Sequence, residues 1–277
     1  MLNKLIKLAE NGYLPDFLIR MGIRRLCKVR LDWKNKVGPE AVEEHHQKLK
    51  ESPIALVPEK ANEQHYEVPP DFFNLVLGRN LKYSSGYWPN ENTSFDDSEV
   101  AMLEKTCERA ELNDGQSILE LGCGWGSLTC FMAKKYPNSK ITAVSNSADQ
   151  KKMIVKRCNS QNLKNITVIT ADMNDFSINE KFDRIVSVEM FEHMRNYESL
   201  LENISNWLKN DGKLFVHIFT HKELVYPFED RGDGDWMARE FFSGGIMPSH
   251  KLLLHFSKHM KIESLWKVNG IHYSKTS

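Results

Sequence analysis

The residues best placed to do chemistry lie in Ser117-Ile-Leu-Glu-Leu-Gly-Cys-Gly-Trp-Gly126, where glycines follow an acid at alternate positions. An apolar run ending at Glu120 is typical of a buried parallel strand. Gly122, Gly124 and Gly126 let the chain turn tightly into a helix whose free N–H groups face a polar ligand. The spacing is not the G-x-G-x-x-G of dinucleotide binders. We therefore predict a site for S-adenosylmethionine (SAM), whose ammonium group Glu120 can meet; a glycine-rich turn without a ligand is the alternative.

A second group of polar residues follows a later apolar run, in Glu189-Met-Phe-Glu-His-Met194. In a helical turn, Glu189, Glu192 and His193 are neighbours at i, i+3 and i+4. Methyl transfer needs an acceptor held in line with the sulfonium carbon and relieved of its proton. Carboxylates can hold an ammonium group and histidine can carry a proton, so we expect all three to be catalytic. A polar helix start and a metal site are the alternatives; we expect no metal, because no second ligand cluster has matching spacing.

Two further strand ends carry candidates for binding the cofactor. SAM enzymes usually place an acid after the second strand for the ribose hydroxyls, and Val144-Ser-Asn-Ser147 has none. Asn146 and Gln150 can supply hydrogen bonds instead. Asp172 can accept from an adenine amino group while Met173 packs on the ring; a plain loop acid is the alternative for Asp172.

These residues need a scaffold in which strands and helices alternate. Five apolar runs have the length and composition of strands: 117–121, 140–144, 166–170, 182–188 and 213–218. Helical segments lie between them, one capped by Ser147 and one over 200–208 ended by Asn210-Asp-Gly212. This alternation predicts an α/β fold with a doubly wound sheet, in which the loops after the strands meet at one edge.

The first hundred residues differ from this pattern. We predict a helical cap and a connecting arm over 1–100, and a SAM-binding domain over 101–277. Pro15 is expected in the first turn of a second helix. Residues 1–36 carry nine basic side chains against three acids, which indicates a solvated helix face or, as the alternative, peripheral contact with a membrane surface.

Composition narrows the partners and the compartment. Lys+Arg and Asp+Glu are 37 each, so no global charge favours nucleic acid. We see no apolar run long enough for an integral membrane segment and no signal peptide. The five cysteines are odd in number and lack metal-binding spacing, so we expect a reducing, cytoplasmic location.

Several segments together resemble the cyclopropane-fatty-acid-synthase superfamily of SAM-dependent methyltransferases, and within it the coclaurine N-methyltransferase branch. The segments that carry the resemblance are His65-Tyr66, Leu81-Lys-Tyr-Ser-Ser-Gly-Tyr-Trp88, Glu120–Gly126, Ser145–Gln150, Glu189–Met194 and His272-Tyr-Ser-Lys-Thr276. Gly12-Tyr-Leu-Pro-Asp16 is also similar to that branch. The resemblance implies a class I SAM methyltransferase fold, Rossmann-like, with an N-terminal helical cap.

The resemblance also implies roles residue by residue. Tyr83 and Ser84 match a pair that touches the methionine end of SAM. The other implied cofactor contacts are the loop glycines Gly122, Gly124 and Gly126, the ribose and adenine contacts Ser145, Asn146 and Gln150, and the adenine pair Asp172 and Met173. Glu189, Glu192 and His193 match the residues that line the amine site of the N-methyltransferase branch.

Two departures from the superfamily affect the expected reaction. Its cyclopropane synthases usually carry a cysteine where this chain has Ser85, which favours another reaction. Relatives also continue well past the His272–Thr276 segment, so we expect an incomplete C-terminus. The favoured function is N-methylation of a small amine; the alternatives are methyl transfer to a lipid alkene and an inactive SAM-binding fragment. Glycine-flanked aromatic residues form a candidate lid over the acceptor, with plain core as the alternative: Trp236, Phe241, Phe242 and Met247.

Overall fold

The computed structural model describes residues 2–34, 39–57, 70–232 and 234–277; His65 and Tyr66 lie outside these ranges. In chain order the helices and strands are α1 (Leu2–Glu10), α2 (Asp16–Lys34), α3 (Pro39–Glu51), α5 (Pro70–Val76), α6 (Phe95–Arg109), β1 (Ser117–Leu121), α7 (Ser127–Lys135), β2 (Lys140–Ser145), α8 (Ala148–Ser160), β3 (Ile166–Thr170), β4 (Phe182–Val188), α9 (Tyr197–Trp207), β5 (Leu208–His217), β6 (Tyr226–Pro227), β7 (Ile246–Met247) and α10 (Ile271–Thr276). Short single-turn helices cover Phe191–His193, Met237–Phe241 and Leu252–His255.

The central sheet confirms the predicted α/β fold. Its five strands are parallel in the order β3-β2-β1-β4-β5. The predicted helix end at Asn210-Asp-Gly212 is wrong: α9 stops at Trp207 and β5 begins at once at Leu208. The register between β4 and β5 shifts near Phe182 and Arg184, so the polar tripeptide lies in the irregular part of the strand pair. A bulge absorbs these residues where a helix terminus was expected.

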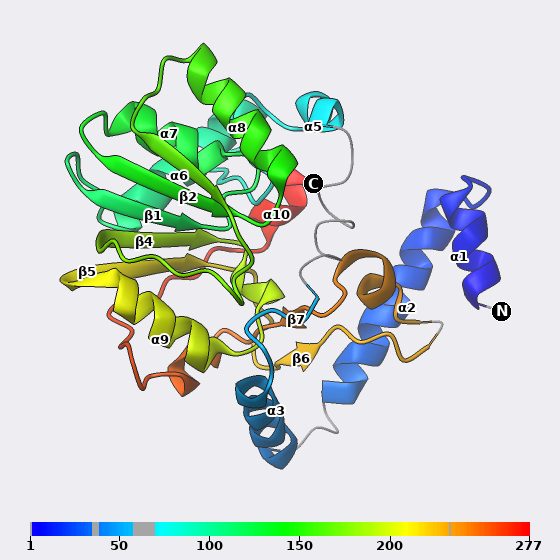
Figure 1. Ribbon diagram of the computed structural model, residues 1–277. Coiled ribbons are helices and arrows are strands. Elements are labelled where there is room, and N and C mark those ends of the chain that lie inside the picture. Colours follow the sequence, from blue (N-terminus) through cyan, green and yellow to red (C-terminus); the bar gives the residue numbers. More distant parts are fainter. Residues whose placement is uncertain (1, 35–38, 58–69, 233) are drawn as a thin grey trace.

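Alternating side chains of the strands build a core on each face of the sheet. Ile118 of β1 packs with side chains of α6 and α7 on one face. Leu119 and Leu121 point the other way and pack with side chains of α9. Figure 1 shows α6, α7 and α8 on one side of the sheet and α9 on the other. Burial on both faces explains why the strands read as near-continuous apolar runs.

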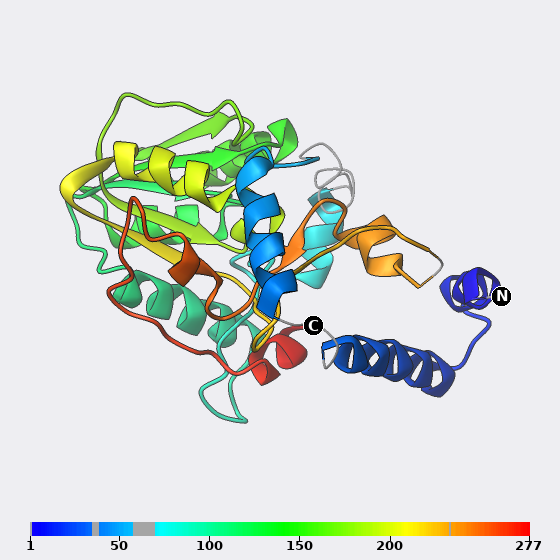
Figure 2. The same cartoon turned by 90° about the horizontal axis from the view of Figure 1, so that it is seen from below.

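The segment after α3 is tied to the loops at the carboxyl edge of the sheet. Figure 2 shows α3 beside α9. The side-chain amide of Asn196 donates to the carbonyls of Lys50 and Ser52, at 2.8 and 2.9 Å. Asn174 bonds both backbone groups of Ala55, at 3.0 and 2.9 Å. These bonds place residues 50–57 beside the loops that follow β3 and β4.

Helices α1 and α2 extend away from the sheet in both views (Figures 1 and 2). Helix α2 begins one residue after Pro15, which lies just before the first turn and accepts hydrogen bonds from it. Arg30 lies over the ring of Tyr226 at 4.3 Å, and Trp236 donates to the carboxylate of Glu10 at 3.1 Å. Across the described ranges, no helix combines the length and apolarity needed to cross a bilayer.

Candidate functional site

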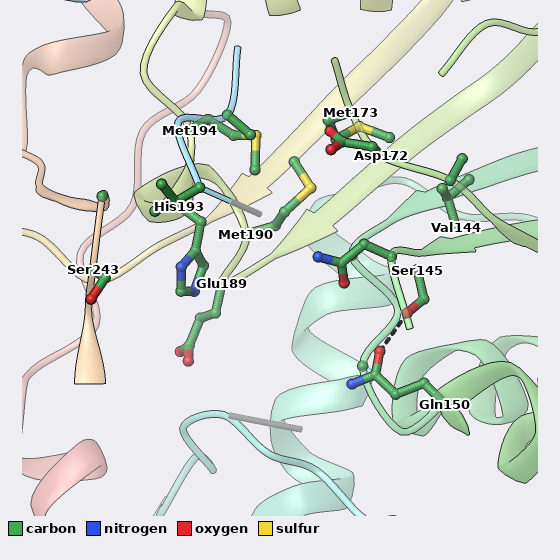
Figure 3. Close-up of a pocket in the computed structure, with 17 residues that line it drawn as sticks. Val144, Ser145, Gln150, Asp172, Met173, Glu189, Met190, His193, Met194 and Ser243 are labelled. Carbon is green, nitrogen blue, oxygen red and sulfur yellow. Dashed lines mark hydrogen bonds between the residues drawn. The ribbon is translucent and has the colours of Figure 1, made fainter. Parts of the chain in front are cut away.

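A pocket opens where the parallel strands end, and residues from distant parts of the sequence line it. Of the predicted site residues it is lined by Gly122, Gly124, Ser145, Asn146, Gln150, Asp172, Met173, Glu189 and His193. Figure 3 shows Ser145, Asp172 and Glu189 around this space, each near the end of a different strand. The doubly wound topology brings these positions together, because the carboxyl ends of parallel strands share one edge.

The three loop glycines differ in what surrounds them. All have positive φ, between 50° and 80°, which favours glycine. A Cβ at Gly122 would meet Met190 at 2.7 Å, and one at Gly126 would meet Ile154 at 2.6 Å. A Cβ at Gly124 would meet nothing within 4 Å. Gly122 and Gly126 therefore permit close packing, whereas Gly124 leaves open space beside the pocket.

The loop after β2 is held by a small hydrogen-bond network. The Ser147 hydroxyl caps α8 by accepting from the backbone amide of Gln150 at 3.3 Å, as predicted. The Ser145 hydroxyl donates to the Gln150 side-chain oxygen (Figure 3) and accepts from the Ser147 amide at 3.0 Å. The Gln150 side-chain nitrogen is buried and has no hydrogen-bond partner in the part of the chain that the structure describes. This unused donor and the open space at Gly124 fit a polar group such as the nucleoside end of SAM.

Asp172 and Met173 follow β3 and complete this half of the pocket. Met173 is buried in the core that also contains Val144. One Asp172 carboxylate oxygen accepts from the Asn174 amide at 2.8 Å, which fixes the turn. Asp172 itself is half-buried and keeps acceptor capacity.

Five predicted residues do not line the pocket: Gly126 and Glu192, and the three cofactor candidates Glu120, Tyr83 and Ser84. Glu120 is buried and accepts from the Thr129 hydroxyl at 2.5 Å; its burial raises the pKa of its carboxyl to about 8. Tyr83 is exposed and makes an edge contact with Phe73. Ser84 accepts a hydrogen bond from the ammonium group of Lys82. Contact between any of these residues and the cofactor stays a prediction.

Glu189 and Glu192 place two carboxyl groups at the end of β4. Glu189 has φ of 52°, a strained value for a residue other than glycine, and its amide donates to the His217 carbonyl at 2.7 Å. It is half-buried and lines the pocket, and desolvation raises the pKa of its carboxyl. Glu192 is 1% exposed; burial first, and then the nearby Glu189 charge, raise its pKa well above the usual range. One Glu192 oxygen is buried without a partner in the described chain.

His193 lines the pocket with Glu189 and packs against one residue of the predicted aromatic lid. Its ring stacks on Phe242, with centroids 4.9 Å apart and planes at 14°. Phe242 is buried and also contacts Phe219, Phe228 and Phe241. The lid segment is more regular than expected, because β6 and β7 pair and a π-turn covers Met237–Phe241. Phe242 therefore serves partly as core, and it orients the imidazole.

The remaining lid candidates are spread more widely. Trp236 contacts Glu10 of α1, and Met247 lies in β7 opposite Tyr226. Neither lines the pocket, whereas Ser243 and Gly244 do.

Sequence reasoning missed a buried network behind Glu189. The Tyr273 hydroxyl donates to the Glu189 carboxylate, and Lys82 acts on it as a nearby positive charge. The C-terminal helix reaches this place because Thr276 accepts from the Gly86 amide at 3.0 Å and from the Trp88 indole at 3.2 Å. The two segments are separate motifs in the sequence, and no local pattern signals contact over such a separation.

Metal ligation has no structural support within the described ranges. No group of three or more His, Cys, Asp or Glu side chains there could hold an ion.

Comparison with known proteins identifies the relatives of this chain. A family model described as mycolic acid cyclopropane synthetase matches residues 57–277. The (S)-coclaurine N-methyltransferase of Thalictrum flavum subsp. glaucum is 41% identical over 281 residues, covering 99% of this chain and 78% of that protein. A crystal structure of coclaurine N-methyltransferase with N-methylheliamine and S-adenosylhomocysteine (SAH) matches with TM-score 0.94 and 39% identity, covering 99% of this chain and 80% of that one. The cyclopropane-fatty-acyl-phospholipid synthase of Escherichia coli K12 is 31% identical over 215 residues, covering 77% of this chain and 53% of that protein.

Proposed function

The chain belongs to the mycolic acid cyclopropane synthetase family, and from this premise we propose that it methylates the nitrogen of a small amine of the coclaurine type. It is a SAM-dependent methyltransferase of the class I fold. The observation that carries the choice of acceptor is a pair of carboxyl groups next to His193: Glu189 lines the pocket together with His193, and Glu192 is buried next to His193 in the chain. Two carboxyl groups in a desolvated site suit an acceptor that brings a positive charge.

On this proposal the loop after β1 and the ends of β2 and β3 bind SAM. Gly124 lets the backbone approach the cofactor closely, and Gln150 donates its unused amide hydrogen. Asp172 accepts from the adenine amino group while Met173 packs on the ring. Tyr83, Ser84 and Glu120 would act at the methionine end. When bound, SAM supplies the electrophilic methyl group.

The chain's own residues then prepare the acceptor. Glu189 holds the amine nitrogen in the pocket, and Glu192 supplies a second oxygen ligand for hydrogen bonding to the amine. His193, oriented by Phe242, takes the proton that the amine must lose before it can attack. The nitrogen lone pair forms the new bond to the methyl carbon as the bond from that carbon to sulfur breaks.

Methyl transfer to a lipid alkene is the second candidate, favoured by the family name and by the bacterial synthase. An alkene would bring no charge to Glu189 and Glu192. Ser85 also stands where those synthases usually have cysteine, and its hydroxyl donates to the Gly86 carbonyl at 2.9 Å. The lipid reaction would then need contact of α1 and α2 with a membrane surface, whereas amine methylation does not.

We place the protein in the cytoplasm. Its five cysteines, odd in number and without metal-binding spacing, support a reducing compartment.

The deciding experiment measures SAH release with heliamine, coclaurine and phospholipid vesicles as separate acceptors. Turnover of either amine without vesicles, with the new methyl group on nitrogen by mass spectrometry, supports the proposal. Turnover only on vesicles supports the lipid reaction. SAM binding without turnover of any acceptor supports an inactive SAM-binding protein.

A further inference from the structure

Lys82 carries a positive charge where lysine is seldom found. Its side chain is 4% exposed, and its ammonium group donates to the Ser84 hydroxyl and to the Ser85 carbonyl, the latter at 2.8 Å. Burial lowers the pKa of Lys82 to about 8, although Glu189 and Glu99 oppose this shift. A buried ammonium is costly unless a nearby anion compensates it.

One of the two nearby carboxylates is already committed elsewhere. Glu99 of α6 is 1% exposed and accepts from the backbone amides of Gly78, Asn80 and Lys82, at 3.2, 2.9 and 3.1 Å. Its oxygens therefore hold the backbone of residues 78–82, which carries the Lys82 side chain. The second carboxylate, Glu189, is the one that faces the pocket.

Ser85 connects Lys82 to Glu189. Its carbonyl accepts from the Lys82 ammonium, and its amide points at a Glu189 oxygen 3.5 Å away. The Tyr273 hydroxyl donates to the same carboxylate. The ammonium, a peptide unit and a phenol thus all stabilise the charged form of Glu189.

The other titratable groups around this network are two carboxyl groups, two tyrosines and a histidine. Those acting on Lys82 or Glu189 in the described chain are Glu99, Glu192, Tyr83, Tyr273 and His217. Burial raises the pKa of both tyrosines, which keeps them neutral. Burial and the Lys82 charge lower the pKa of His217 to about 3, so its ring is neutral as well.

We propose that Lys82 is a positioning residue that decides which of the two acidic side chains is the anion, keeping Glu189 ionised and facing the acceptor while Glu192 holds a proton. The inference rests on the proposed amine site and names the device that sets its charge. Two neighbouring carboxyl groups in a dry site do not both ionise readily. A cation on the Glu189 side alone breaks the symmetry between them.

The test uses a cation whose charge does not change with pH, so that only the protein titrates. The affinity of the SAH-loaded protein for the N,N-dimethyl quaternary salt of heliamine is measured by calorimetry from pH 5 to 9. Lys82→Gln removes the charge but keeps a donor for Ser84 and Ser85. It should move the midpoint of the pH dependence upward by about one unit, because Glu189 loses its compensating cation. Lys82→Arg keeps the charge and should keep the midpoint.

A purely structural role for Lys82 predicts a different result. The affinity of Lys82→Gln for the salt would then differ from that of the wild type by the same factor at every pH, and the midpoint would not move. That result overturns the proposal. Failure of the wild-type protein to bind the salt also overturns it. If Lys82→Gln does not fold, the double variant with Glu189→Gln decides: recovered folding supports charge compensation, and a double variant that stays unfolded contradicts it. Absence of amine turnover would count against the proposed function but would leave a midpoint shift standing.

Discussion

Gly124 and Gly115 form a matched pair for testing the cofactor loop. Their φ values are 50° and 89°, and a Cβ at either would meet nothing within 4 Å. Gly124 lines the pocket, whereas Gly115 lies exposed in the turn before β1. Alanine at either position therefore costs similar backbone strain, roughly 1 kcal/mol. Only at Gly124 would the added methyl group occupy the space that we assign to SAM.

We expect Gly124→Ala to weaken SAM binding at least tenfold, equivalent to about 1.4 kcal/mol. Gly124→Val should weaken it further, because a branched side chain fills more of the open space. Gly115→Ala should keep the wild-type affinity. Calorimetric titration measures the affinities, and thermal melts without SAM should show both alanine variants losing a similar few degrees.

Two outcomes would refute this reasoning. Unchanged SAM affinity in Gly124→Val would mean that the cofactor does not approach this backbone. Equal losses of affinity in Gly124→Ala and Gly115→Ala would assign the effect to general destabilisation.

Three further predictions address catalysis, burial and the N-terminal helices. Glu192→Ala and His193→Ala should each lower methyl transfer while SAM affinity stays within a few-fold; equal loss of SAM binding would assign them to the cofactor site or to folding. Glu120→Gln should match the wild-type free energy of unfolding near pH 4.5 and exceed it by about 1 kcal/mol or more above pH 8. The reason is that the raised pKa of Glu120 makes the wild type lose stability as pH rises between those values. Denaturant titrations without SAM check this, and a free energy of unfolding that depends on pH in the same way in both proteins would contradict it. Deleting residues 1–8 should leave amine turnover without vesicles nearly unchanged, and a large loss would show that α1 contributes to the amine site.

Much of the sheet could be predicted because its strands are buried on both faces. In an α/β chain, a short and mostly apolar run such as 182–188 fits a strand that is covered on both sides. The start of β5 could not be predicted, because Asn210-Asp-Gly212 has the composition of a helix end. Only pairing with β4 across a bulge, which is a tertiary effect, places these residues in a strand.

The site residues also fall into those that the local sequence pattern predicts and those that only tertiary contacts bring into place. The positions of Asn146, Asp172 and Glu189 at the pocket were predictable, because strand ends in a parallel sheet converge at one edge. Lys82 and Tyr273 were not, because they approach Glu189 through contacts between residues 82–88 and the C-terminal helix. Such contacts depend on how the chain folds back and leave no periodic trace in the sequence.

On the proposed function, the charges around Glu189 and Glu192 favour an amine over an alkene as the methyl acceptor. Bound SAM adds a positive sulfonium, and an incoming ammonium group would be repelled by it in a site of low dielectric. An ionised Glu189 offsets that repulsion, and loss of the amine proton to His193 removes it before attack. After transfer to a tertiary amine or a secondary one, the nitrogen again carries a positive charge that Glu189 stabilises as the sulfonium charge disappears. An alkene begins neutral and yields a carbocation only after the methyl group has moved, so the carboxyl groups of Glu189 and Glu192 would destabilise its bound ground state without holding it in place.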